Sequence, residues 1–82
     1  MVYKLIDDSE YVRIALVEQG FGLDTLIYDK CPNVRRTMVK HRFGLNKLVY
    51  DFDWQVRLEV ARHGYGVDIL INDKNPEIRE NS

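Results

Sequence analysis

Apolar and polar positions along the chain recur with a 22-residue period. The stretch GFGLDTLIYD at residues 20–29 returns as RFGLNKLVYD at 42–51 and as GYGVDILIND at 64–73. No insertion or deletion interrupts this spacing. A fixed period of this length is typical of proteins built from stacked structural repeats. We divide the chain into a half unit at 1–8, three repeats at 9–30, 31–52 and 53–74, and a partial unit at 75–82.

Each repeat begins with a pattern typical of a capped helix. The position before the helix holds, in turn, Ser9, Cys31, Asp53 and Asn75. Serine, aspartate and asparagine are good N-cap residues, and a proline follows at 32 and 76, where its missing N–H does no harm. Glycine at 20 and 64 ends the helical spacing, because glycine adopts the left-handed conformation at little cost. Arg42 holds that position in the middle repeat and weakens the stop signal there.

The pattern predicts longer helices near residues 10–19, 32–42 and 54–63. A shorter helical piece follows each glycine corner, over residues 23–28 in the first repeat. A strand in TLIYD and KLVYD is the alternative, because these stretches carry β-branched and aromatic residues. The apolar pair Leu26–Ile27 does not alternate, which favours a helix. Helices this short are unstable alone, so the all-α fold must be stabilised by packing between neighbouring repeats, with the recurring leucine in the core. That leucine is Leu26, Leu48 and Leu70.

An aspartate is followed six residues later by an arginine four times, and a valine or isoleucine precedes each arginine. The pairs are Asp7 and Arg13, Asp29 and Arg35, Asp51 and Arg57, and Asp73 and Arg79. This pattern resembles the Asp…Val-Arg core of HEAT repeats, in which the aspartates and arginines form a ladder through the stack. The unit is shorter than an ordinary HEAT unit of about 40 residues. In its length the unit also resembles the leucine-rich repeat variant group, which pairs an α-helix with a 3₁₀-like helix.

These resemblances cover nearly the whole chain and imply a short right-handed α-solenoid of about three and a half two-helix repeats. They also imply that the Asp–Arg pairs are scaffold, and that the helices carrying the Val-Arg pair line the concave face. The outward positions of those helices are Ile14, Glu18, Arg36, Lys40, Leu58, Glu59 and Arg62. These outward positions differ between repeats, whereas scaffold positions recur. We therefore expect the outward residues to determine binding specificity.

Charge separates the middle repeat from its neighbours. The formal net charge of the chain is -1, so no global field attracts nucleic acid or membrane. Residues 31–52 carry five basic residues against one acid, a net charge of +4, between acidic flanking repeats. The sequence therefore predicts a protein–protein interaction module that binds an acidic partner surface. Binding of a nucleic-acid backbone by the same basic band is the alternative, and a merely solvated face is the third reading. The predicted partner-binding residues are Glu18, Arg36, Lys40, Arg42, Lys47, Trp54 and Arg62.

Candidate chemistry is sparse. Cys31 holds a capping position, and His41 and His63 share one position at the end of the longer helix, where a cation is favoured. Trp54 is a candidate binding contact if exposed, and packing under the neighbouring repeat is the alternative. No catalytic, cofactor or metal motif is recognised, so we expect no enzyme activity, cofactor or metal. The single cysteine and the lack of an apolar run of about 18 residues predict a cytoplasmic protein.

The two ends of the chain each match part of a repeat. Leu5 and Ile6 at the start are apolar, and the polar stretch EIRENS at the end is short, so we expect it to cover little of Leu70 and Ile71. Exposed apolar ends of a stack favour association. The sequence therefore leaves several expectations open: a monomer, weak head-to-tail self-association, and capping of the ends by a partner chain or by further residues of a longer chain.

Overall fold

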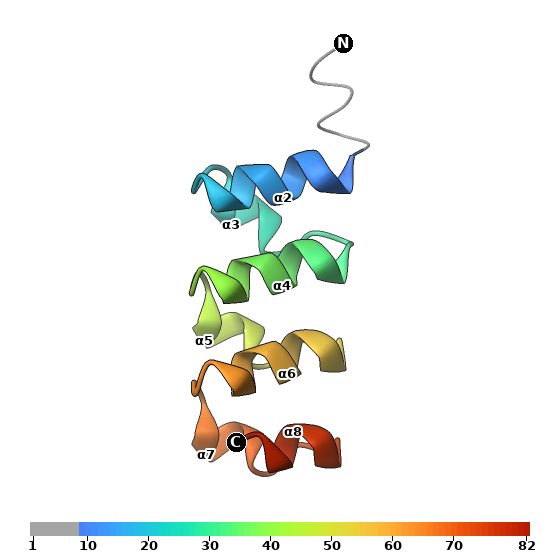
Figure 1. The fold of residues 1–82 in the computed structure, drawn as a ribbon, viewed down its shortest axis with the longest axis vertical. Helices are drawn as coiled ribbons and strands as arrows, with labels where there is room; N and C mark the ends of the chain where they lie inside the picture. The colour runs from blue at the N-terminus through green and yellow to red at the C-terminus, as the bar shows by residue number, and fades with distance from the viewer. Residues whose placement is uncertain (1–8) are drawn as a thin grey trace.

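A computed structural model describes residues 9–82, which form seven helices and no strand (Figure 1). The helices are α2 (Glu10–Glu18), α3 (Leu23–Leu26), α4 (Pro32–Lys40), α5 (Leu45–Leu48), α6 (Trp54–Arg62), α7 (Val67–Leu70) and α8 (Pro76–Glu80). Helix accounts for 59% of the described residues. The all-α prediction is therefore confirmed for this range, and the strand alternative is wrong. The predicted half unit at 1–8, with Leu5, Ile6 and Asp7, lies outside the described residues.

The longer helices lie side by side in one row. Figure 1 shows α2, α4, α6 and α8 one above another, and each contacts the next. The short helix α3 contacts both α2 and α4, and α5 contacts both α4 and α6. The longer helices begin at 10, 32, 54 and 76, so their starts keep the 22-residue spacing of the sequence. The row is elongated and measures 45 × 18 × 15 Å.

Three of the four predicted N-cap residues form the expected bond at the start of their helix. The side chain of Ser9 accepts a hydrogen bond from the Val12 N–H, at 3.4 Å. Asp53 and Asn75 accept from the N–H two residues later, at 2.8 and 2.9 Å. Cys31 makes no side-chain capping bond. The start of α4 therefore lacks an interaction that α2, α6 and α8 possess.

The three longer helices that lead into short ones end in the same hydrogen-bonded turn. After α2, the Gly20 N–H donates to the Val17 carbonyl and the Phe21 N–H donates to the Leu16 carbonyl, both at 2.9 Å. This pair of bonds is a Schellman motif, which needs a left-handed residue at the position of Gly20. Arg42 adopts that conformation after α4, with φ of 60°, and the same two bonds form there. The helix stop expected to be weak at Arg42 is therefore present.

The core is continuous along the row and consists of aliphatic side chains from every helix. The leucine predicted to be buried in each repeat is buried, with exposures of 7% for Leu26, 2% for Leu48 and 1% for Leu70. The expectation that the last residues would leave Leu70 uncovered is wrong, because α8 closes over the core through the buried Ile78. Ile71 is exposed, as expected.

Arginine side chains link each segment to the next. Arg35 donates through Nε and Nη2 to the carboxylate of Asp51, at 2.7 and 3.2 Å. Its Nη1 donates to the backbone carbonyl of Asp29. Arg57 makes the same bonds one segment later, to the Asp73 carboxylate and the Asp51 carbonyl. Each central arginine therefore joins two successive aspartates.

These bonds refine the Asp–Arg ladder implied by the resemblance. Each aspartate carboxylate pairs with the arginine 16 residues before it, and the arginine six residues after it binds only its backbone carbonyl. The same carboxylate also accepts the N–H of the next helix-capping residue, as Asp73 does from Asn75 at 2.9 Å. One aspartate thus connects the end of a short helix, the start of the next longer helix and the preceding arginine.

Burial of Asp73 raises the pKa of its carboxyl group. The hydrogen bonds from Arg57 and from the Asn75 N–H, together with the Arg57 charge, outweigh that effect and lower the pKa below its ordinary value. The charged form of this carboxylate is therefore favoured by folding.

Candidate interaction surface

The exposed face of the longer helices carries three of the predicted binding residues at equivalent positions. Glu18, Lys40 and Arg62 end α2, α4 and α6, and all three are exposed. Because these helices lie side by side, the three residues hold equivalent positions on successive helices, one acid followed by two bases.

A polar groove lies between α2 and α4 on this face. Its volume is about 260 Å³, and its lining includes Tyr11, Ile14, Asn33, Arg36 and Lys40. Two of these, Arg36 and Lys40, are predicted binding residues that the fold brings together. Tyr11 is 81% exposed and was missed by sequence reasoning, although an aromatic residue at a position occupied by asparagine and glutamine in the next two repeats was a usable signal.

Arg36 is partly neutralised by its neighbour on α6. Its Nη2 lies 3.6 Å from Oε1 of Glu59, and Oε2 of Glu59 lies 3.7 Å from Nε2 of His63. The Arg36 Nε is buried and has no hydrogen-bond partner among residues 9–82. The prediction that Leu58 and Glu59 point outward is wrong, because both are buried where α6 packs between α4 and α8.

Arg42 and Lys47 do not join this face. Arg42 lies in the turn after α4, where its Nη1 donates to the His63 carbonyl at 3.5 Å. Lys47 lies on α5, and its Nζ donates to the Tyr28 hydroxyl at 2.8 Å. Both line a separate cleft with Asp24, of about 410 Å³. The basic residues of 31–52 are thus divided between two places, and the single basic band predicted from sequence does not form.

Exposed aromatic residues gather around the short helices and the loops that follow them. Phe52 is 85% exposed, with the Arg35 guanidinium 4.9 Å from its ring centroid. Lys47 lies 5.3 Å from the ring centroid of Tyr28, which is exposed like Tyr50. Trp54, a predicted binding residue, is 42% exposed. Sequence reasoning missed Phe52 and the two tyrosines, because each stands at a position that polar residues fill in another repeat.

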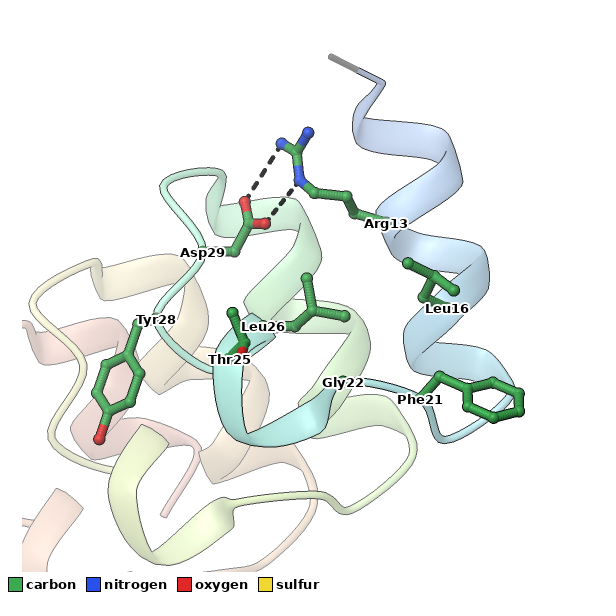
Figure 2. Close-up of a pocket in the computed structure, with 8 residues that line it drawn as sticks. All are labelled: Arg13, Leu16, Phe21, Gly22, Thr25, Leu26, Tyr28 and Asp29. Carbon is green, nitrogen blue, oxygen red and sulfur yellow. Dashed lines mark hydrogen bonds and ion pairs between the residues drawn. The ribbon is translucent and has the colours of Figure 1, made fainter. Parts of the chain in front are cut away.

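A larger apolar cleft lies at the end of the row formed by α2 and α3. Its volume is about 670 Å³, and Figure 2 shows the Arg13–Asp29 ion pair at one edge and Phe21 at the opposite edge, with Leu16 and Leu26 between them. The half unit predicted to adjoin this segment lies outside the described residues.

The described residues offer few groups for chemistry. Within 9–82, no cluster of three or more His, Cys, Asp or Glu residues could hold a metal ion. The Cys31 sulfur accepts a hydrogen bond from Nη2 of Arg13 at 3.2 Å, so it is engaged in the scaffold. Over the same range, none of the helices combines the length and apolar character needed to cross a bilayer.

No protein-family model, curated protein or solved structure matches this chain.

Proposed function

We propose that this chain is a non-catalytic protein-interaction module. It is a short right-handed α-solenoid of about three and a half two-helix repeats, similar to HEAT repeats and to the leucine-rich repeat variant group. Two observations support this architecture: the 22-residue spacing of helix starts, and the arginine–aspartate bonds that connect each segment to the next. The module acts in the cytoplasm, alone or with weak head-to-tail self-association.

The partner presents an acidic surface to the exposed face of the longer helices. The observation that carries this proposal is the groove between α2 and α4, where Arg36 and Lys40 stand beside the exposed ring of Tyr11. Aromatic and arginine side chains are the groups that most often dominate binding energy at protein interfaces. Glu59 holds Arg36 in place, and Lys40 is exposed and can meet a carboxylate of the partner. Glu18 and Arg62 flank the groove residues along the row and set the charge pattern a partner must match.

Nucleic acid fits this surface less well than an acidic protein. A phosphate backbone is long and uniformly charged, so it gains most from a continuous basic band. Here Arg42 and Lys47 lie in a different cleft from Arg36 and Lys40. Glu10, which lines the groove, and the exposed Glu18 on α2 would repel a long phosphate backbone.

The test uses the intact chain to retain partners, which are identified by mass spectrometry, and then measures the affinity of one purified partner. We expect the double charge reversal Arg36→Glu with Lys40→Glu to weaken that affinity by about tenfold or more, since like charges across an interface are costly. Lys40→Glu alone should leave the melting temperature within a few degrees, because Lys40 is exposed, and it should weaken the affinity on its own. The reversal at Arg36 places like charges beside the buried Glu59, so it should lower the melting temperature of the double variant.

A matched control reverses two positive charges that do not line the groove, Lys30→Glu with Lys74→Glu, both exposed in loops. Affinity should stay close to that of the original chain. Equal losses in the two double variants would indicate a nonspecific charge effect, and an unchanged affinity in the groove variant would place the binding site elsewhere.

A further inference from the structure

Exposed aromatic rings gather in the part of the row between α3 and α6. Tyr28 and Tyr50 hold the same position one repeat apart and are 70% and 68% exposed. Phe52, in the loop between α5 and α6, is 85% exposed, whereas the other two repeats carry a lysine at its position. The structure describes a segment on either side of these rings, and neither segment covers them. They are therefore a surface available to another molecule.

A cleft of about 200 Å³ is lined by Tyr28 from one repeat and Phe52 from the next. Ile27 and Leu48 contribute the aliphatic part of its lining. The guanidinium of the buried Arg35 lies 4.9 Å from the centroid of the Phe52 ring and supports one face of that ring. The cleft is large enough to receive a small apolar side chain between two aromatic rings.

The polar groups of this cleft are hydrogen-bond donors, because its carboxylate is already occupied. The oxygens of Asp51 accept bonds from Arg35 and from the Asp53 N–H. The Lys47 Nζ donates to the Tyr28 hydroxyl at 2.8 Å, which leaves the hydroxyl proton and further ammonium protons available to donate. In the described part of the chain, no carboxylate forms an ion pair with Lys47. The cleft therefore favours a ligand that supplies acceptors and a negative charge.

We propose that this cleft binds a proline-rich segment of a partner protein that carries one acidic residue. Consecutive prolines lack N–H groups but keep their carbonyl acceptors, so they match a cleft that offers donors. Their rings are compact and apolar, and aromatic-lined grooves are a known way to bind them. A carboxylate in the segment pairs with Lys47 in a charge-assisted hydrogen bond.

The repeat spacing of the row suits the pitch of such a segment. Packed helices lie about 8–10 Å apart, so Tyr28 and Tyr50 are separated by about that distance along the row. A polyproline II helix advances about 9.3 Å in each turn of three residues. Residues three apart in the ligand therefore meet equivalent positions beside the two tyrosines. This cleft shares no lining residue with the groove between α2 and α4, so the proposal does not depend on the proposed function.

The probes are fluorescein-labelled peptides of about nine residues, all proline except one glutamate whose position varies along the set. Fluorescence anisotropy measures their affinity for the intact chain, and we expect at least one Kd below about 1 mM. Tyr28→Asn and Phe52→Lys should each weaken binding of that peptide by about fivefold or more, because each removes an aromatic wall. The third repeat carries asparagine and lysine at these two positions, so both variants should keep the fold.

Lys47→Gln tests the charge. It should weaken binding of the glutamate peptide by about fivefold or more, and it should weaken much less the same peptide with glutamine in place of glutamate. Equal losses for the two peptides would overturn the pairing of the acidic residue with Lys47.

Tyr11→Ala is the matched control, because Tyr11 is an exposed aromatic residue that lines the groove between α2 and α4. Peptide affinity should stay close to that of the original chain. The proposal is overturned if no peptide binds with a Kd below about 1 mM, or if Tyr11→Ala weakens binding as much as Tyr28→Asn. Bases also stack on exposed aromatic rings. A single-stranded oligothymidylate that binds more tightly than every peptide, and that Tyr28→Asn weakens, would make nucleic acid the occupant and overturn the assignment to a proline-rich segment.

Discussion

Among the residues that precede the longer helices, Cys31 alone makes no capping bond, although its backbone has the extended conformation typical of an N-cap. Replacing it with aspartate supplies an oxygen that can accept the Asn33 N–H, as Asp53 accepts the Gln55 N–H. A carboxylate also interacts favourably with a helix N-terminus. We expect Cys31→Asp to raise the free energy of unfolding by about 0.5–1 kcal/mol, measured by urea denaturation at neutral pH.

Cys31→Ala is the comparison variant, because it removes the sulfur without adding an acceptor. The sulfur accepts a hydrogen bond from Arg13, so alanine should be slightly less stable than cysteine. Asp53→Ala should lose about 1 kcal/mol for the reverse reason. If aspartate and alanine at position 31 were equally stable, the proposed cap would not form there.

The titration of Asp73 makes the free energy of unfolding depend on pH in one direction. Its pKa is lower in the folded chain than in the unfolded chain, where an aspartate titrates at about 3.9. The stabilisation it contributes is therefore fully present above about pH 4 and is lost as the pH falls through the lower folded value. Asp73→Asn should reduce stability at neutral pH and make stability less dependent on acid below about pH 4.

Urea midpoints at neutral pH and at about pH 2.5 measure this difference. Asp68→Asn is the control, because Asp68 is exposed and makes no ion pair within the described residues. It should leave the acid dependence close to that of the original chain. An Asp73→Asn variant whose stability fell with acid as steeply as the original would contradict the role given to this carboxylate.

At the scale of helices and the turns between them, two glycines in one corner allow a matched comparison. Gly64 and Gly66 both have positive φ, 73° and 69°. A Cβ added at Gly64 meets nothing within 4 Å, whereas a Cβ added at Gly66 meets the Val49 side chain at 2.6 Å. Because valine is stiff about its first torsion, Val49 cannot easily turn away.

Gly64→Ala should therefore cost only the backbone strain of a left-handed alanine, about 1 kcal/mol. Gly66→Ala should cost about 1–3 kcal/mol more, because the added methyl group overpacks the contact between α5 and α7. Thermal and urea unfolding of the two variants measure the difference directly. Equal destabilisation would show that neighbouring segments do not approach closely at this corner.

The starts of the longer helices could be predicted because their signals are local in sequence. The end of α3 and the burial of Glu59 could not be predicted in this way. A serine, aspartate or asparagine at the N-cap position, or a proline at the first helical position, marks the start of each longer helix. The short helix after Gly22 ends at Leu26 and not at 28, because the Tyr28 and Asp29 N–H groups bond three residues back in a tight turn. No local pattern marks that change. The burial of Glu59 likewise depends on the helices on either side of α6.

The spacing of the ladder shows the same limit. The sequence places each aspartate six residues before an arginine, and this spacing predicts that these two residues pair. The carboxylate nevertheless binds the arginine of the preceding longer helix, as Asp51 binds Arg35. Two arginines stand at periodic positions near each aspartate. The distance between neighbouring helices decides which of them the carboxylate binds, and that distance depends on packing.

Over the whole molecule, the division of basic residues decides how the chain responds to a polyanion. Arg36 and Lys40 lie beside one groove, whereas Arg42 and Lys47 lie in another cleft. A charge count along the sequence could not reveal this division, because the turn after α4 carries the chain away from the face of the longer helices. One rigid partner surface therefore contacts fewer basic side chains than the net charge of +4 in residues 31–52 suggests.

This division predicts a weak dependence of DNA binding on salt. Each phosphate neutralised on duplex DNA contributes about 0.9 to the slope of log affinity against log salt concentration, so the two basic residues that line the groove between α2 and α4 give a slope of about -2. Four acting together would give about -4. Fluorescence anisotropy with a labelled duplex, between about 50 and 200 mM salt, measures the slope. We expect about -2 for the original chain, and Arg36→Glu with Lys40→Glu should remove binding through the groove between α2 and α4. The contrary result is a slope near -4 for the original chain, halved in this variant and also in Arg42→Glu with Lys47→Glu. It would show that one duplex contacts all four basic residues. The proposed partner would then be nucleic acid and not an acidic protein.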